Sequence, residues 1–288
     1  MTTRRYASPE AFKQALEQRL RAATKTGADF ARKRQLLVFD RLLARIVQVL
    51  GTAVTLKGGL VLELRLDRAR TTKDIDLRMT GSADGVLARL QEAARFDLGD
   101  FFTFEVGPDQ DRPDIQGDGM IYDGLRFQAT CTMAGKPYGQ PFGVDVGFSD
   151  PILGAPDVVT AEDTLGFAGI APPTLRLYPI ETHIAEKLHA YTLPRARPNS
   201  RLKDLPDLAL LAGVKPLDSK RVRAALDIAR PIGPVPSDLS FPVLAVISDT
   251  RSGSTTHRSS FRSRRWPTKP RPAFLPVDDR LVSARPSI

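Results

Sequence analysis

The chain has 288 residues, of which 42% are hydrophobic and 26% charged, a balance typical of a globular protein with a buried core. No apolar run is long enough to span a membrane, and the first residues lack the apolar core of a signal peptide. The single Cys131 cannot form an internal disulfide. We therefore expect a cytoplasmic protein without a membrane partner, rather than a disulfide-stabilised secreted one.

The formal net charge of +9 is distributed unevenly. The segment from Ser248 to Ile288 holds nine Lys and Arg against three Asp, which leaves only +3 for the rest of the chain. The main body is therefore not expected to bind polyanions strongly through net charge alone.

Two helices are predicted at the N-terminus, in residues 1–50. Ser8 and Pro9 form a typical helix start, and the first helix should continue to about Ala23. Gly27 is expected to break it, and a longer amphipathic helix should follow from Phe30 to Leu50. Six basic residues gather where these helices meet, either as a solvated face or as a contact for a nucleic-acid backbone. They are Arg19, Arg21, Lys25, Arg32, Lys33 and Arg34.

A strand, a glycine turn and a helix are predicted next. A short apolar run from Ala53 to Leu56 is followed by Lys57, then by Gly58 and Gly59, then by a leucine-rich segment. Glycines at such a turn let the backbone approach a ligand, and the free N–H groups of a helix start favour an anion such as a nucleotide phosphate.

The segment after that helix predicts a metal-binding strand. Asp74 and Asp76 are two residues apart, so a strand places both carboxylates on one face while Ile75 and Leu77 point into the core. Two carboxylates on one face can hold Mg²⁺, which prefers oxygen ligands.

Residues 51–178 should complete a mixed sheet. A helix is expected over Ser82–Arg95, and strands over Phe101–Val106, Leu125–Met133, Phe142–Phe148 and Thr174–Tyr178. Gly107–Gly119, Gly135–Pro141 and Asp157–Pro173 are predicted to be connections.

Asp145 interrupts the apolar strand over Phe142–Phe148. Strand alternation places its carboxylate on the face opposite Val144 and Val146, where it either meets solvent at an edge strand or binds a metal. Together with Asp74 and Asp76, it could provide a third carboxylate for two Mg²⁺ ions.

Three helices are predicted over residues 179–230, from about Ile180 to Tyr191, from Arg201 to Ala212 and from Asp218 to Ala229. The remaining residues, 231–288, are rich in Pro and Arg and have no apolar period, so we predict a poorly ordered tail. Capture of RNA by this tail and a shifted reading frame relative to its ancestors are alternative explanations. The fold class expected is α+β, a mixed sheet with flanking helices and a C-terminal helical part.

Four ordered motifs carry a resemblance to a known family. Lys-Gly-Gly from Lys57, Arg70 to Leu77, Glu186 to Ala190 and Arg201 to Leu208 together resemble the AbiEii/AbiGii toxins of the nucleotidyltransferase superfamily. The resemblance covers about residues 35–215 and implies a nucleotidyltransferase-like fold. Where family members usually carry Ser or Thr after the two glycines, this chain has Leu60, which removes about one phosphate hydrogen bond, on the order of 1 kcal/mol.

The resemblance implies roles for named residues. Asp74, Asp76, Lys187, Asp204 and Asp207 are implied to be catalytic, with metal ligands among Asp74, Asp76 and Asp145. The implied nucleotide-binding residues are Lys57, Gly58, Gly59, Thr72 and Lys187.

The resemblance also implies a Mg²⁺-dependent transfer of a nucleotide from a nucleoside triphosphate to an acceptor hydroxyl, most often of tRNA, in a toxin–antitoxin or phage-defence system that includes an antitoxin. Two alternatives stay open: a catalytically weak relative that binds RNA or a partner protein, and a nucleotidyltransferase acting on a small molecule.

Overall fold

The computed structural model describes residues 6–66, 71–111, 113, 124–148, 151–192 and 200–229. All of these residues belong to one compact unit. The predicted tail over residues 231–288 lies outside the described ranges, as does most of the predicted connection between Gly107 and Gly119. The division of the chain at residues 50, 178 and 230 stays a prediction.

Two capped helices open the chain, as predicted. Helix α1, Pro9–Ala22, begins where the Ser8 hydroxyl accepts a hydrogen bond from the N–H of Ala11. Helix α2, Gly27–Leu50, begins where Thr26 accepts one from the N–H of Asp29. The expectation that Gly27 lies in a break was wrong by a few residues, because the Thr26 cap allows Gly27 to be the first helical residue.

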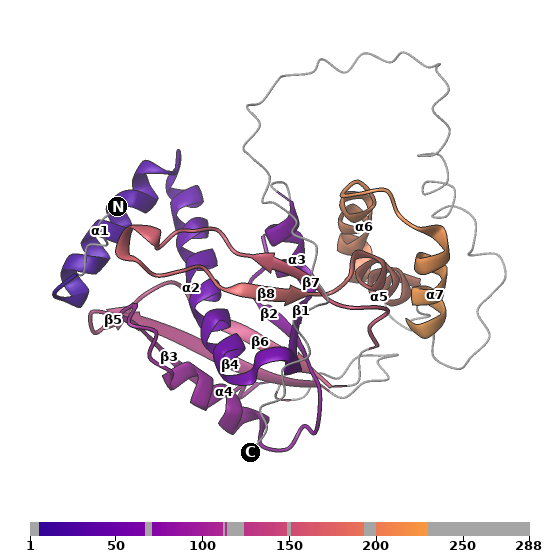
Figure 1. Cartoon of the computed structure of the whole chain (residues 1–288), viewed down its shortest axis with the longest axis horizontal. Helices are drawn as coiled ribbons and strands as arrows, with labels where there is room; N and C mark the ends of the chain where they lie inside the picture. The colour runs from indigo at the N-terminus through magenta and orange to yellow at the C-terminus, as the bar shows by residue number, and fades with distance from the viewer. Residues whose placement is uncertain are drawn as a thin grey trace, which may run out of the picture. The chain divides into compact units, whose positions relative to one another are not determined.

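A mixed sheet forms the centre of the protein (Figure 1). Its strands follow the order β3-β4-β6-β2-β1-β8-β7, and β5 pairs with β4. The pairs β2–β6 and β1–β8 are parallel, and the other pairs are antiparallel. The strands are β1 Val54–Lys57, β2 Ile75–Met79, β3 Phe102–Pro108, β4 Gly124–Met133, β5 Lys136–Pro137, β6 Phe142–Gly147, β7 Asp157–Thr160 and β8 Thr174–Leu177.

Strand β7 was missed by the sequence prediction, which treated Asp157–Pro173 as a connection. The strand has four residues, pairs only with β8 in the described sheet, and leaves Val158 exposed. A short edge strand buries little surface, so its sequence carries almost no periodic signal, and pairing with β8 decides its conformation. The two-residue β5 within the predicted turn over Gly135–Pro141 was missed for the same reason.

Two shorter helices connect the strands. Helix α3, Gly58–Arg65, follows β1 directly, which confirms the predicted order of strand, glycine turn and helix. Helix α4, Val86–Arg95, begins four residues later than predicted, because Gly85 at its start adopts a left-handed conformation with φ of 67°.

One face of the sheet is apolar and the other is polar. Helix α2 contacts β1 and β8, and α4 contacts β3, so these helices cover the apolar face. Strand β2 alternates buried and half-buried residues, with Ile75 and Leu77 fully buried in the main core, as predicted. The polar residues between them, Asp76 and Arg78, therefore lie on the opposite face.

Helices α5, Ile180–Thr192, α6, Asp204–Ala212, and α7, Ser219–Ala229, group beside one end of the sheet (Figure 1). A short 3₁₀ turn, Ser200–Lys203, precedes α6, so the helix expected from Arg201 begins as a tighter turn. These helices share a small core of their own, to which α3 contributes Leu62. The residues of this core are Leu62, Ile180, Ile184, Leu208, Leu211 and Val222.

The α+β class is confirmed: a mixed sheet has flanking helices and a C-terminal helical part. Within the described ranges, no helix combines the length and apolar character needed to cross a membrane.

Candidate active site

The turn between β1 and α3 brings the backbone against Asp76. Gly58 has φ of 69°, and a Cβ atom built on it would lie 1.9 Å from Oδ2 of Asp76. Any side chain at this position would collide with that carboxylate, so the glycine is required by the contact as well as by the turn. Lys57 makes no side-chain cap, and Leu60 is buried in the main core.

Four charged residues occupy equivalent positions on four neighbouring strands. Asp76 on β2 is in register with Lys57 on β1 and with Asp145 on β6. Asp145 is in turn in register with Arg126 on β4. We call Arg126, Asp145, Asp76 and Lys57 the charge row. Two acids lie in the middle of this row and a cation lies at each end.

Asp145 is not at a sheet edge, because β6 lies between β4 and β2. Its carboxylate accepts two hydrogen bonds from Arg126, at 2.7 Å from Nε and 2.6 Å from Nη2. Such a bidentate pair is among the stronger hydrogen-bonded contacts in proteins. Of the two explanations for this buried-strand acid, exposure at an edge is therefore excluded.

Asp74 lies just before β2 and approaches β6. Its Oδ1 accepts a hydrogen bond from the N–H of Gly143 at 3.3 Å, and a Cβ at Gly143 would lie 2.8 Å from the same oxygen. Gly143 is two residues from Asp145 on β6, so both belong to the same face. A second glycine thus makes room for a second predicted metal ligand.

Thr72 is positioned by two residues that sequence reasoning did not single out. Its N–H donates to Glu63 of α3 at 2.6 Å, and its carbonyl accepts from Arg32 of α2 at 2.9 Å. Arg32 also forms an ion pair with Glu63. This network fixes the segment that leads into Asp74. The Thr72 hydroxyl is 3.4 Å from the Asp74 carbonyl, and the side chain is buried.

Burial raises the pKa of Asp76 to about 6. Lys57 opposes this shift, while the negative charges of Asp145, Glu186 and Asp74 add to it. The sheet therefore gathers acidic groups around one half-buried carboxylate whose charged form is disfavoured. A cation bound at this place would remove that penalty.

Lys57 connects the sheet to the C-terminal helices. Its Nζ lies 2.9 Å from Oε1 of Glu186 on α5. Glu186 begins the third of the four family motifs, and the sequence predicted no role for it. The adjacent Lys187 points elsewhere: it donates to Asp204 at 3.1 Å and to Asp207 at 2.8 Å, both on α6.

Lys187, Asp204 and Asp207 form a buried cluster, which we call the α5–α6 cluster. The two acids lie in the first turn of α6, three residues apart on one side of the helix. Lys187 is buried, and both of its partners belong to another helix. No charged side chain of this cluster points freely into solvent.

His183 lies near both the α5–α6 cluster and the charge row. It is fully buried, and neither ring nitrogen has a hydrogen-bond partner among the described residues. Burial lowers its pKa well below the usual value, and the positive charges of Lys187, Arg65 and Lys57 add to that effect. His183 is therefore neutral.

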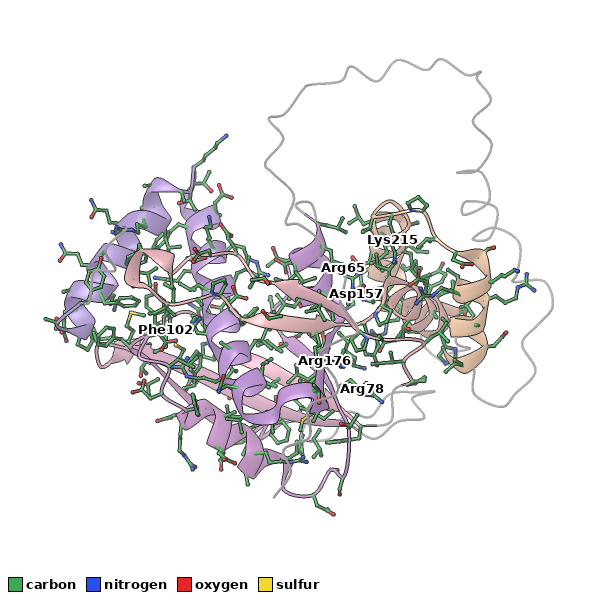
Figure 2. The ribbon with its side chains drawn as sticks, in the orientation of Figure 1. Arg65, Arg78, Phe102, Asp157, Arg176 and Lys215 are labelled. Carbon is green, nitrogen blue, oxygen red and sulfur yellow. The ribbon has the colours of Figure 1, made fainter. Side chains whose placement is uncertain are left out.

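Arg65, at the end of α3, contacts strand β7 and the segment that precedes α5. Its Nη2 donates to Oδ2 of Asp157 on β7 at 2.7 Å and to the carbonyl of Tyr178. Figure 2 shows Arg65 and Asp157 together between the sheet and helices α5 to α7.

The basic N-terminal cluster is largely neutralised within the fold. Arg21 and Arg34 pair with Glu17, Lys33 pairs with Glu162, and Arg32 pairs with Glu63. Arg19 stacks on the ring of Phe167 at 4.1 Å. These contacts favour a structural role for the cluster over contact with a nucleic-acid backbone.

The acids in and beside the charge row are of the type that binds a divalent cation. Asp74 and Asp76 supply oxygen ligands on one face, and the two glycines leave their carboxylates room beside the backbone. Within the described ranges, no three His, Cys, Asp or Glu side chains are arranged to hold a metal. Asp145 faces Arg126 instead of its two acidic neighbours. Mg²⁺ commonly takes only one or two protein carboxylates and completes its shell with water and substrate phosphates.

The structure thus brings the predicted residues together in two places. Asp74, Asp76, Asp145, Lys57 and Gly58 meet on one face of the sheet. The α5–α6 cluster is joined to that face through Glu186. The residues missed were Arg126, Glu186, Arg32 and Glu63. The alternation of β4 could have indicated Arg126, whereas the other three depend on contacts between elements distant in sequence.

The family model described as the nucleotidyl transferase AbiEii toxin of a type IV toxin–antitoxin system matches residues 41–231. No curated protein sequence matches the chain.

A solved structure shares the fold. MenT4, a nucleotidyltransferase toxin from Mycobacterium tuberculosis, aligns over 74% of this chain and 68% of its own, with 21% identity and a TM-score of 0.50. JHP933 from Helicobacter pylori aligns over 66% of this chain and 68% of its own, with 17% identity and a TM-score of 0.41.

The family match covers well over half of the sequence. It includes the glycine turn, the strands β2 and β6 that carry Asp76 and Asp145, and the α5–α6 cluster. The chain therefore belongs to the AbiEii family of toxin nucleotidyltransferases.

Proposed function

We propose that this protein transfers a nucleotide from a Mg²⁺-bound nucleoside triphosphate to an acceptor hydroxyl, and that the acceptor is tRNA. The observation that carries the proposal is the gathering of acids around Asp76, directly beside the glycine turn that opens α3. The choice of tRNA rests on the family resemblance of the four motifs. Family membership supports a further partner, an antitoxin protein that neutralises the enzyme.

In this proposal the acceptor oxygen forms a bond to the α-phosphorus while the bond to the β-phosphate breaks. Pyrophosphate leaves with the electron pair of that bond, and the proton of the acceptor hydroxyl passes to solvent water. Asp74 and Asp76 would hold Mg²⁺, with Asp145 as a further ligand. The metal, when bound, would neutralise charge on the phosphates and lower the barrier to attack. The N–H groups of Gly58 and Gly59 at the start of α3 would face a phosphate, since Lys57 leaves that end without a side-chain cap.

The contacts of Lys187 support a role for this residue. Its ammonium group is shared by Asp204 and Asp207, so its position is fixed by α6. We propose that this cluster holds Lys187 close to the triphosphate, with the two acids setting its orientation. Thr72 would contribute by holding its segment in place, because Glu63 binds its backbone N–H and Arg32 binds its carbonyl.

The proposal is tested by incubating the full chain with total RNA, Mg²⁺ and each of the four labelled nucleoside triphosphates in turn. We expect label to enter the tRNA fraction with one or more of the triphosphates, and the transfer to stop when EDTA is added. Asp76→Asn should reduce transfer by at least about 100-fold, since it removes a carboxylate that would hold the metal at the reacting phosphates.

Asp97→Asn is the matched control, because it makes the same change at an exposed loop position. It should retain transfer. Label in protein or in a small molecule instead of RNA would refute tRNA as the acceptor while preserving the reaction. If no acceptor were labelled by the folded wild-type chain, with RNA binding intact, the chain would be a binding relative and the catalytic proposal would fail.

A further inference from the structure

Arg126 binds the carboxylate of Asp145, which would be the third acid of the proposed metal site. Both oxygens of Asp145 accept hydrogen bonds from its guanidinium, at 2.7 and 2.6 Å. The Arg126 side chain is 31% exposed and that of Asp145 is 15% exposed, so the pair lies at the accessible side of the sheet face. Nothing in the sequence motifs marks Arg126, and its contact is a product of strand register.

The surroundings of Arg126 are acidic on several sides. Asp145 makes two hydrogen bonds to Arg126, and the negative charges of Asp74 and Asp109 also act on its guanidinium. Its guanidinium compensates the same acids that a divalent cation would compensate.

The two acids of the charge row are neutralised from opposite ends. Asp76 has Lys57 as its neighbour in register, and Asp145 has Arg126. Lys57 has a second acid, Glu186, with which to pair. The bidentate geometry between Arg126 and Asp145 uses both oxygens of the carboxylate, so a metal ion could bind Asp145 fully only if Arg126 moved.

We propose that Arg126 is a positioning residue that competes with the divalent cation for Asp145. It holds Asp145 on the sheet face while the site is without metal, and it releases the carboxylate when metal and triphosphate enter together. The phosphates offer the displaced guanidinium an alternative anionic partner. This inference rests on the proposed function, because it concerns the same metal site, and it adds a residue that the family motifs do not contain.

The test is a titration of the full chain with Mn²⁺ alone, without nucleotide, followed by the electron paramagnetic resonance signal of free Mn²⁺. Arg126→Gln removes the cation and keeps a polar side chain. We expect it to bind Mn²⁺ about tenfold more tightly than the wild type, equivalent to about 1.4 kcal/mol. The double variant Arg126→Gln with Asp145→Asn should lose this gain. A purely structural role for Arg126 would not tighten metal binding.

Two further variants control the result. Arg89→Gln removes one positive charge from a half-buried position on α4, away from the charge row, and should leave Mn²⁺ affinity unchanged. Arg126→Lys keeps the charge but cannot make the two-pronged contact, so it should give an intermediate gain and serves if Arg126→Gln does not fold. If neither variant binds Mn²⁺ more tightly than Arg89→Gln, the inference is wrong.

Asp76→Asn separates this inference from the proposed function. If Asp76→Asn weakens Mn²⁺ binding but the Arg126 variants do not change it, the metal site stands and only the role of Arg126 fails. If Asp76→Asn leaves Mn²⁺ binding unchanged, the proposed metal site itself fails.

Discussion

The protein has two regions that differ in their balance of apolar and polar contacts. One is the sheet with its N-terminal helices, and the other is the group of C-terminal helices. The first region has a large apolar core that extends from α1 through α2 and α4 to the strands. Helices α5 to α7 share a core of six buried residues, one of them supplied by α3. The smaller region depends more on polar contacts, among them the α5–α6 cluster and the ion pairs of Lys57 with Glu186 and Lys215 with Glu181.

Each region contains a buried charged cluster, and the two have opposite composition. In the first, Asp100 accepts hydrogen bonds from Arg41 and Arg45, so two cations share one acid. In the α5–α6 cluster, two acids share Lys187. The first cluster lies in the main core and connects α2 to the start of β3, where Arg45 also donates to the carbonyl of Phe102. The difference agrees with a structural role for the first cluster and with the role in nucleotide transfer that we propose for the second.

The largest expected effect on stability comes from replacing an Asp by Asn, and the comparison makes this change once in each cluster. Asp100→Asn would leave two buried arginines without a counter-ion, so we expect the free energy of unfolding to fall by about 3–5 kcal/mol. Asp207→Asn leaves Lys187 with Asp204 and should cost less than about 1 kcal/mol, while transfer activity falls by at least about tenfold. Chemical denaturation and label transfer, measured on both variants, check the pair.

The control for these variants is Asp97→Asn, at an exposed position, whose effect on unfolding should stay within about 0.5 kcal/mol. Equal losses of stability in Asp100→Asn and Asp207→Asn, with no loss of transfer in the latter, would remove the distinction between the clusters.

The second prediction compares the two apolar cores. Leu77→Ala and Leu211→Ala each truncate a fully buried leucine, and each should cost about 2–5 kcal/mol where the site cannot collapse. Leu77 lies in the main core, so its truncation should weaken the whole sheet. Leu211 lies in the small core, so its truncation should open α5 to α7 locally. Hydrogen exchange followed by mass spectrometry distinguishes the two outcomes.

Faster exchange across the sheet in Leu211→Ala would show that the two regions unfold as one unit. Leu202→Ala, at an exposed position in the 3₁₀ turn before α6, is the matched control and should leave exchange in both regions close to that of the wild type.

The smallest expected effect concerns the pKa of Asp76, which is raised to about 6 in the folded protein from 3.8. A raised folded pKa means that ionising Asp76 destabilises the fold. Stability is therefore lost as the pH rises from about 4 to 6, and stays reduced above that range. In EDTA at pH 7.5, Asp76→Asn should be more stable than the wild type by about 1–3 kcal/mol.

This gain should shrink toward zero at about pH 3, where Asp76 is mostly protonated in both the folded and the unfolded state, and thermal unfolding at the two pH values measures it. Added Mg²⁺ should stabilise the wild type and not the variant. A lower stability of Asp76→Asn at pH 7.5 in EDTA would mean that the carboxylate contributes favourable contacts that outweigh its burial.

Much of the fold could be predicted from local sequence because it depends on neighbouring residues. The caps at Ser8 and the alternation around Asp76 and Asp145 fixed helix starts and strand faces, and both follow from backbone geometry within a few residues. The edge strand β7 could not be predicted in this way. Its four residues are extended because β8 offers them hydrogen bonds, not because of their own pattern.

The sequence by itself singled out the residues that we propose to carry the chemistry. Local spacing marked the paired glycines, Asp74, Asp76 and Asp145, and the family resemblance marked Lys187 and the two acids of α6. The tertiary structure alone decided how they are partnered. Register placed Arg126 against Asp145, the packing of α5 placed Glu186 against Lys57, and α6 enclosed Lys187. The physical reason is that a charged side chain is held by the nearest opposite charge, and that neighbour is set by contacts between segments far apart in the chain.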